Sequence, residues 1–326
     1  MRCSFGRAGR ACSQRSRCPG ASTWIRAPAR CSRPAAYGAE GKLDIRLIVS
    51  DVDGTLLNSN QQLSPAVEAA VKQARTLGVL TCVATGKARG PWIADVLPRL
   101  QLDTPGVFMQ GLLVYDAQGQ VLHERRLEED VALDCIALAA GAGVTLTAYC
   151  GDRILCAATD AHTDRLNFYK EPPPEAVGEL AAVVSGGGGV PVHKMIFMAD
   201  QDRIDALRPA VEALLAGRAS LTTALTGMLE VLPLGCSKGA GLSWLLEWLD
   251  VAPGQVMALG DGENDVEMLQ LAGLGVAMGN AGPKAKAAAD VVLEATNDQD
   301  GVAEAIRRFV LEPARLAEAT AAPHRR

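Results

Sequence analysis

Short apolar runs alternate with helical patterns over much of the chain. The apolar runs predict buried strands at 46–51, 79–84, 106–110, 255–259 and 274–278. Helical patterns separate them at 65–77, 91–100, 265–272 and 284–289, and Ser64-Pro65 is a favourable start for the first. Strands that are apolar on both faces and are spaced by helices predict an α/β fold with a doubly wound parallel sheet.

The middle of the chain has a different pattern. Residues 144–149 and 153–157 alternate on either side of Gly151-Asp152, which predicts an antiparallel hairpin. Further helices are expected at 161–169, 175–184 and 202–215, and further strands at 194–198 and 228–232. We therefore expect a separate α+β layer inserted into the α/β domain.

These patterns divide the chain into five segments. The expected order is a leader at 1–39, a first core segment at 40–124, the α+β insert at 125–228, a second core segment at 229–312, and a fraying tail at 313–326. Within the insert, four consecutive glycines at 186–189 predict a surface loop. No strand–glycine–helix pattern surrounds them, so a phosphate cradle is not expected there.

The leader differs in composition from everything that follows. Residues 1–39 contain eight Arg, no Lys and no acid, with many Ser and Ala and no continuous apolar stretch. This composition predicts a transit peptide for the chloroplast or the mitochondrion. A disordered basic tail is the other interpretation. The remaining residues hold 24 Lys and Arg against 37 Asp and Glu, a net charge near −13. A body this acidic argues against nucleic acid as the main ligand.

Two further classes are disfavoured by simple counts. No run of eighteen apolar residues occurs, so no transmembrane helix is expected. Five of the nine cysteines lie beyond the leader, at 82, 135, 150, 156 and 236, and none forms a C-x-x-C pair. We therefore expect no zinc site and reduced thiols, with Cys82 packed inside its strand.

Carboxylates follow two of the apolar strands directly. Asp51 and Asp53 stand in an acidic turn before Gly54, and Asp261, Asn264 and Asp265 stand in a second one. In open α/β sheets, ligands bind outside the carboxyl ends of the strands, and oxygen ligands suit Mg²⁺. A single acidic turn is also an ordinary surface feature. Two at one sheet edge favour a shared metal, and a carboxylate there could also attack phosphorus.

Two further features, each a weaker signal by itself, could bind a phosphate group. Thr85-Gly86 ends the second strand, where a hydroxyl and backbone N–H groups suit a phosphate oxygen. Lys238 precedes a helix and is, by itself, an ordinary surface lysine. Near an acidic centre it could neutralise charge on a phosphoryl group.

In this order, the four features resemble the haloacid dehalogenase (HAD) superfamily. The matching residues are Asp51-Val-Asp53-Gly-Thr-Leu-Leu57, Ala84-Thr-Gly86, Lys238 and Gly260-Asp-Gly-Glu-Asn-Asp265. The insert resembles the type IIB cap of Cof-type phosphatases, and the resemblance covers about 43–310. Gly86-Lys-Ala-Arg89 and Gln110-Gly-Leu-Leu-Val-Tyr115 resemble the HAD half of plant plastid proteins that carry a YbeY-type endoribonuclease in front. That nuclease half, with its His-rich metal motif, is absent from this sequence.

The resemblance implies a Mg²⁺-dependent phosphomonoester hydrolase that works through an aspartyl-phosphate. Its substrate would be a small phosphorylated metabolite, either a sugar phosphate or a vitamin-pathway phosphate. Asp51 would be the nucleophile, Asp53 the general acid–base, and Lys238 the group that orients Asp51 and offsets phosphoryl charge. An acid at position 53 suits a phosphatase, because an alcohol leaving group needs a proton, and it disfavours dehalogenation.

The resemblance also implies a phosphate site and a metal site. Thr85, Gly86 and Asn264 would bind the phosphoryl group. Asp51, Asp53 through its carbonyl, and Asp261 would hold Mg²⁺, with Asp265 supporting the metal shell. Lys87 and Gln110 depart from the family pattern, which has Arg and Asn there, and are expected to tune the substrate.

Two other functions fit the same resemblance. One is a catalytically quiet partner protein in organellar RNA or ribosome maturation, although such a protein has no need of the intact site residues. The other is a phosphomutase, which must keep water from the aspartyl-phosphate. The sequence gives no information on the oligomeric state or on the cap residues that set specificity.

Overall fold

The computed structural model describes residues 44–185, 189–223 and 225–321, so the predicted transit peptide lies outside the described residues. Five parallel strands form a sheet in the order β14-β13-β12-β1-β2. They are β1 (Leu47–Ser50), β2 (Leu80–Val83), β12 (Val256–Gly260), β13 (Leu274–Ala277) and β14 (Val291–Val292). Because β1 lies between β12 and β2, the two acidic turns and Thr85 follow three adjacent strands. This sheet and its helices, called the core below, confirm the α/β class.

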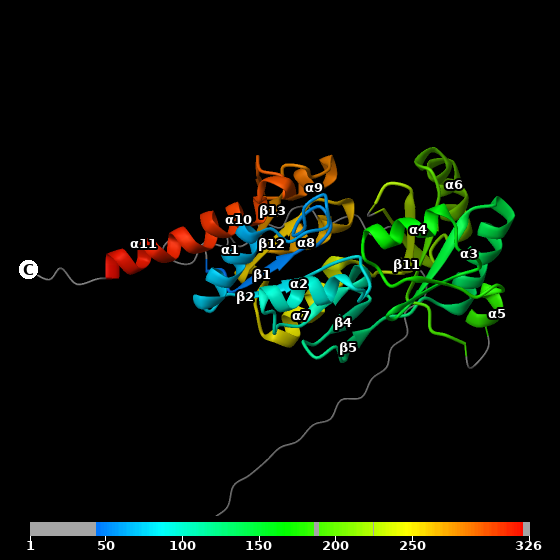
Figure 1. The fold of residues 1–326 in the computed structure, drawn as a ribbon, viewed down its shortest axis with the longest axis horizontal. Helices are drawn as coiled ribbons and strands as arrows, with labels where there is room; N and C mark the ends of the chain where they lie inside the picture. Colours follow the sequence, from blue (N-terminus) through cyan, green and yellow to red (C-terminus); the bar gives the residue numbers. More distant parts are fainter. Residues whose placement is uncertain (1–43, 186–188, 224, 322–326) are drawn as a thin grey trace, which may run out of the picture. The chain divides into compact units, whose positions relative to one another are not determined.

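Helices pack on the sheet as the apolar periodicity predicts. They are α1 (Pro65–Thr76), α2 (Trp92–Leu100), α7 (Lys238–Leu249), α8 (Val266–Leu271), α9 (Pro283–Ala288) and α10 (Gly301–Ile306). Ser64 caps α1, since its hydroxyl accepts the Val67 N–H at 3.1 Å, and the buried stripe includes Val67, Val71 and Ala74. In Figure 1, α1 and α10 lie on one side of β1 and α7 lies on the other.

The predicted strand at 106–110 does not extend the parallel sheet. Residues Gly106–Phe108 form β3, which pairs antiparallel with β4 (Leu113–Tyr115), and β4 pairs with β5 (Val121–Glu124). One bridge, between Ala84 and Val107, connects β3 to the end of the β2 region. The predicted strand is therefore present at 106–108, and its one bridge to the core is parallel. The chain turns back at Met109–Gly111, so the rest of its pairing is antiparallel, with β4.

The inserted α+β layer, called the cap below, contains a six-stranded sheet in the order β10-β11-β9-β6-β7-β8. The strands are β6 (Thr145–Cys150), β7 (Arg153–Cys156), β8 (Pro174–Ala176), β9 (Lys194–Met198), β10 (Ala219–Thr222) and β11 (Met228–Pro233). The predicted hairpin is present as the antiparallel pair β6–β7. The helices of the cap are α3 (Glu129–Ala142), α4 (Ala161–Phe168), α5 (Leu180–Val184) and α6 (Gln201–Leu214).

Strand alternation gives this cap sheet two apolar faces. On β9, Met195 and Phe197 belong to the cluster under α3, α5 and α6, whereas Ile196 and Met198 belong to the cluster of the core. The same alternation holds for β11, where Leu229 and Val231 face the helices. Side chains on the same face of the cap sheet as Ile196 therefore face the end of the core sheet.

Three predictions in this region need correction. A helix at 175–184 was expected, but Pro174–Ala176 form β8 against β7, and only Leu180–Val184 are helical. The insert was expected to end at 228, but β11 continues in the cap sheet to Pro233, so we place the return to the core after that residue. The tail from 313 was expected to fray, but α11 continues from Glu312 to Ala321. Residues 322–326 lie outside the described residues.

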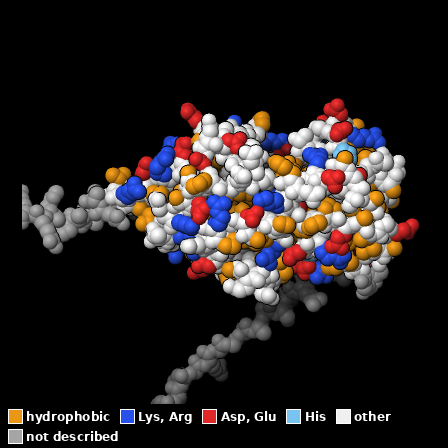
Figure 2. Space-filling model, viewed as in Figure 1, with side chains coloured by type: hydrophobic (Ala, Val, Ile, Leu, Met, Phe, Trp, Pro, Cys, Tyr) orange, Lys and Arg blue, Asp and Glu red, His pale blue; other side chains and the backbone are white. Residues whose placement is uncertain are grey.

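The surface and interior agree with the composition. Cys82, Cys135, Cys150, Cys156 and Cys236 are all buried free thiols. On the face drawn in Figure 2, Lys and Arg are interspersed with Asp and Glu, and no broad basic stripe forms. Within the described ranges, no helix has the length and apolarity needed to cross a membrane.

Candidate active site

The centre of the site is Asp51, the first residue after β1. Its side chain is 8% exposed, and its Oδ1 accepts a hydrogen bond from Lys238 Nζ at 2.6 Å. Burial raises the pKa of Asp51 well above its usual value, and the charge of Asp265 adds to this effect. The strand end thus holds a carboxylate whose charge depends on its neighbours.

Lys238 reaches Asp51 from the first turn of α7. Ser237 caps that helix by accepting the Ala240 N–H at 3.1 Å. This hydrogen bond fixes the start of α7 and so the position of Lys238. Lys238 Nζ also donates to Asp265 Oδ1 at 2.7 Å, and the lysine side chain is fully buried. Burial acts to lower the pKa of Lys238, but the charges of Asp265 and Asp51 outweigh it and raise that pKa. The ammonium therefore stays charged and links the two acidic turns.

The second acidic turn follows β12, the neighbour of β1. Asp265 Oδ2 accepts the backbone N–H groups of Asp261 at 2.9 Å and Gly262 at 2.8 Å, so Asp265 braces the turn. Asp261 Oδ1 accepts the Thr55 hydroxyl at 2.7 Å. Burial, with a further contribution from Asp265, raises the pKa of Asp261 to about 7.

Glycine 54 allows the two turns to approach this closely. Its φ is +79°, and a Cβ placed there would lie 2.5 Å from Asp261 Oδ2. A side chain at this position would be strained and would collide with the carboxylate. The glycine in the sequence Asp53-Gly54-Thr55 is therefore required by the fold of the site.

The carboxylates present fit a Mg²⁺ ion. Oxygen atoms of Asp51, Asp261 and Asp265 all lie within 4.8 Å of one another. Both oxygens of Asp265 are taken by Lys238 and by backbone N–H groups, which leaves Asp51 and Asp261 as the side chains able to bind a cation. Hard oxygen donors suit Mg²⁺, and a cation would offset the raised pKa values of both groups. The structure places the Asp53 carboxylate outside this cluster.

Asp53 faces a different partner, the lysine that replaces the arginine of the family pattern. Lys87 Nζ lies 3.1 Å from Asp53 Oδ1 and also donates to the Tyr169 carbonyl of the cap. Lys87 is itself buried, and the Thr85 hydroxyl accepts its backbone N–H at 3.1 Å. One departure from the family pattern therefore lies beside the predicted acid–base residue.

Gln110, the second residue that departs from the family pattern, connects the expected phosphate-binding residues to the cap. Its Oε1 accepts from Asn264 Nδ2 at 3.1 Å, and its Nε2 donates to Glu230 Oε2 at 3.2 Å. A Cβ on Gly86 would lie 2.6 Å from Gln110 Nε2, so this amide packs directly on the loop after β2. Asn264, Gly86 and Gln110 thus form one connected wall.

The cap adds charged side chains that the sequence motifs did not indicate. Lys194 on β9 donates to Gly86 O and to Glu230 Oε2, each at 2.8 Å, and its Nζ lies 4.6 Å from the Tyr149 ring centroid. Lys194 lies on the same face of β9 as Ile196, two residues away, and is the cross-strand neighbour of Tyr149. The sequence held one signal for these residues. Lys194 on β9 and Glu230 on β11 are each a single charge inside an otherwise apolar strand.

Glu171, after α4, is the third buried charge of the cap. Its Oε2 accepts the Ala88 N–H at 3.1 Å. Burial raises its pKa to about 7, although the charges of Lys87 and Lys194 oppose the rise. No sequence pattern indicated this residue, because it stands in a proline-rich segment between two elements.

Core and cap together line a small cavity of about 50 Å³. Its walls include the predicted residues Asp51, Asp53, Gly86, Asp261 and Asn264 together with the cap residues Tyr149, Glu171, Lys194 and Glu230. Thr85, Lys238 and Asp265 do not line the cavity, but each is hydrogen-bonded to a residue that does. The structure therefore brings the predicted site residues to one place.

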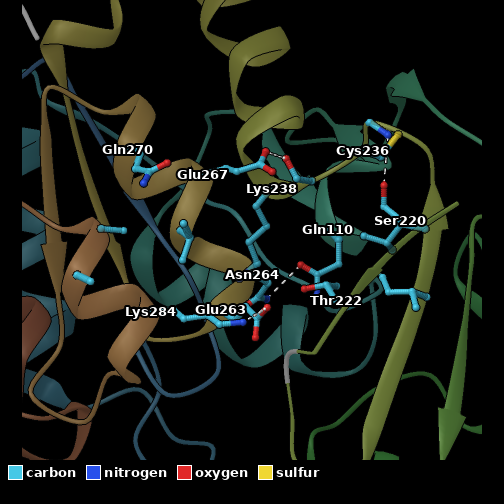
Figure 3. Close-up of a pocket in the computed structure, with 17 residues that line it drawn as sticks. Gln110, Ser220, Thr222, Cys236, Lys238, Glu263, Asn264, Glu267, Gln270 and Lys284 are labelled. Atoms are coloured by element: carbon cyan, nitrogen blue, oxygen red, sulfur yellow. Dashed lines mark hydrogen bonds and ion pairs between the residues drawn. The ribbon is translucent and has the colours of Figure 1, made fainter. Parts of the chain in front are cut away.

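A larger cleft of about 660 Å³ shares Asn264 with this cavity (Figure 3). It is lined by Gln110, Lys238 and Asn264 as well as by Ser220, Glu263 and Lys284, but not by Asp51, Asp53 or Asp261. Gln110 faces this cleft while bonding to Asn264 and Glu230, which line the smaller cavity. We place the chemistry in the smaller cavity, because the nucleophile candidate and the metal-binding carboxylates line it.

The chain matches the family model of the haloacid dehalogenase-like hydrolases over residues 48–306. It is 40% identical over 273 residues to the protein named endoribonuclease YBEY, chloroplastic, from Arabidopsis thaliana, covering 80% of this chain and 46% of that protein. The chain therefore spans about half the length of that relative. It is 31% identical over 253 residues to an HMP-PP phosphatase of Enterobacter sp. (strain 638), covering 73% and 86%. A solved haloacid dehalogenase-like hydrolase from Bacteroides thetaiotaomicron aligns with a TM-score of 0.72 at 28% identity, covering 81% and 99%.

Proposed function

This chain belongs to the haloacid dehalogenase-like hydrolase family, and on that basis we propose that it is a Mg²⁺-dependent hydrolase of small phosphomonoesters. The observation that carries the proposal is the buried link Asp51–Lys238–Asp265, with Asp261 beside it. The similarity to a phosphatase over 86% of that protein supports a phosphatase activity.

In the first half-reaction, Asp51 attacks the phosphorus atom of the ester. A bond forms between a carboxylate oxygen of Asp51 and phosphorus, and the bond from phosphorus to the leaving-group oxygen breaks. Asp53 donates a proton to that oxygen, so the product leaves as an alcohol. The 2.6 Å hydrogen bond from Lys238 orients Asp51 and offsets negative charge on the phosphoryl group.

In the second half-reaction, water hydrolyses the aspartyl-phosphate. Asp53 takes a proton from that water, whose oxygen bonds to phosphorus while Asp51 leaves as a carboxylate. Thr85, Gly86 and Asn264 hold the phosphoryl oxygens. Lys87, 3.1 Å from Asp53, keeps that carboxyl turned toward the cavity through both steps.

Asp51, Asp261 and the Asp53 carbonyl would hold Mg²⁺, which supplies electrostatic stabilisation for the charge that develops on the transferring group. Asp265 does not need to bind the metal itself. Its two oxygens keep Lys238 and the backbone of the second turn in place.

The small volume between cap and core favours a small substrate. At about 50 Å³ it is far below the 300–1,000 Å³ typical of small-molecule sites. The cap must therefore move to admit an ester and then close over it, which excludes bulk water from the reaction. A sugar phosphate or a vitamin-pathway phosphate fits this limit. The chloroplastic relative supports a plastid location for the enzyme.

Phosphate release from a panel of small phosphomonoesters tests the proposal. We expect the full chain to release phosphate with Mg²⁺ and not with EDTA, and Asp51→Asn to be inactive while binding Mg²⁺ less tightly. Asp205→Asn, an exposed acid on α6, is the matched control and should equal the parent. A folded parent protein that releases no phosphate from any ester would overturn the proposal.

A further inference from the structure

The charges that the cap presents to the cavity are unequal. Lys194, Glu230 and Glu171 are all buried and all line the cavity. The Lys194 ammonium is already engaged, because it donates to Glu230 Oε2 and to the Gly86 carbonyl. The cap therefore offers two carboxylates and one lysine that is neutralised by one of them.

One oxygen of each cap carboxylate has no partner among the described residues. Glu230 uses Oε2 for both Lys194 and Gln110, and Glu171 uses Oε2 for the Ala88 N–H. Neither Oε1 is among the fully enclosed unpaired atoms found in the described ranges, which belong to Gln61, Thr81 and Thr104. Each Oε1 therefore reaches open space, and for two side chains this buried that space is the cavity they line.

The lysines that line the cavity have no charge to spare for a second anion. Lys87 is engaged by Asp53 and by the Tyr169 carbonyl, and Lys194 is engaged as described. Ionised carboxylates only accept hydrogen bonds, and a second anion placed beside them would be buried against like charge.

We propose that Glu171 and Glu230 select the leaving group by accepting hydrogen bonds from it. The inference rests on the proposed phosphatase function and adds a substrate class: esters whose leaving group is uncharged or cationic and rich in hydroxyl or amino donors. Esters that carry a carboxylate or a second phosphate on the leaving group are rejected. The selection resides in two cap residues that make no contact with the transferring phosphoryl group.

Three esters with the phosphate on the same carbon test this inference. The leaving group of glucosamine 6-phosphate carries an amino group, that of glucose 6-phosphate carries only hydroxyl groups, and that of 6-phosphogluconate carries a carboxylate. With the full chain, Mg²⁺ and pH 8, we expect kcat/KM for the first two to exceed that for 6-phosphogluconate by at least about tenfold. Glu171→Gln and Glu230→Gln should each reduce this ratio severalfold, while Glu175→Gln, an exposed cap glutamate, should leave it unchanged.

The outcomes separate the two proposals. Release from p-nitrophenyl phosphate, together with equal or better use of 6-phosphogluconate, overturns the selection by Glu171 and Glu230 but leaves the phosphatase intact. The same holds if p-nitrophenyl phosphate is the only ester used, or if neither folded Gln variant, checked by thermal unfolding, changes the ratio. No release from any ester, p-nitrophenyl phosphate included, overturns the phosphatase itself.

Discussion

Asp51 in the core and Lys194 in the cap are buried charges at the same cavity, but the chain holds them by different means. Asp51 follows the end of β1, and its neighbours Asp261 and Thr85 follow the adjacent strands β12 and β2. Backbone register alone therefore brings these residues together. Lys194 and Glu230 lie within β9 and β11, on the same sheet face as Ile196.

This difference has a chemical counterpart. The core groups are cross-linked by short hydrogen bonds to one another, with Lys238 bonded to both Asp51 and Asp265. The cap groups bond to the core through Gly86 and Gln110, across a boundary that opens in the proposed reaction. Rigid positioning favours the reaction itself, whereas groups on a moving layer suit the recognition of variable leaving groups.

The largest expected effect comes from removing the cation that links the core carboxylates. Lys238→Met leaves Asp51 and Asp265 buried without their partner, so we expect unfolding to become easier by about 3–5 kcal/mol. We expect kcat to fall by at least about 100-fold, because charge on the phosphoryl group is no longer offset. Urea denaturation in EDTA and phosphate release with Mg²⁺ measure the two effects.

Lys284→Met is the matched control for this substitution. Lys284 pairs with Glu263 at 2.7 Å, but its side chain is 68% exposed. Its loss should change stability by no more than about 0.5 kcal/mol and leave kcat near the parent value. If Lys238→Met behaved like this control, the description of the core as a cross-linked set of charges would be wrong.

A pH titration of stability probes the cap half of the comparison. Burial raises the pKa of Glu171 to about 7 from an ordinary value of 4.5. The folded state then binds more protons than the unfolded state between these values, so this residue makes the protein less stable as the pH rises through that window. Glu171→Gln removes this loss. We expect it to gain up to about 3 kcal/mol over the parent between pH 4.5 and pH 8, measured by urea denaturation in EDTA.

Glu175→Gln should show the opposite sign. Glu175 is exposed, and the hydrogen bond from Arg153 lowers its pKa. Its removal should therefore cost a little stability above pH 4.5 rather than restore any. Parallel pH curves for the two variants would show that Glu171 is not held as a desolvated carboxyl in the cap.

The sequence predicted the core better than the cap for a physical reason. Parallel strands buried on both faces read as continuous apolar runs, and residues at their ends share one edge whatever lies between them. Asp51, Thr85 and Asp261 could therefore be placed together from β1, β2 and β12 alone. In the cap, Pro174–Ala176 pair with the edge of β7, a tertiary contact that local pattern does not contain, and the helix α3 was not predicted.

The site residues of the cap escaped prediction for a related reason. A lone lysine in Lys194–Met198 or a lone glutamate in Met228–Pro233 is compatible with either face of a strand, and only the register between strands shows which face meets the core. Glu171 stands in no regular element. Lys87 and Gln110 were noticed only as departures from a pattern, and the structure shows them beside Asp53 and Asn264.

The smallest expected effect sharpens the comparison at one glycine of the core. Gly54 and Gly78 both have φ of +79°, so an alanine at either position carries similar backbone strain, about 1 kcal/mol. A Cβ at Gly78 meets nothing within 4 Å, whereas a Cβ at Gly54 lies 2.5 Å from Asp261 Oδ2. We therefore expect Gly78→Ala to lose stability alone and Gly54→Ala to lose activity as well, by about tenfold, with weaker activation by Mg²⁺. Phosphate release measured against Mg²⁺ concentration distinguishes the two, because displacement of Asp261 weakens metal binding and strain elsewhere does not. Equal activity in both variants would show that Asp261 can move without cost, contrary to a core held by fixed register.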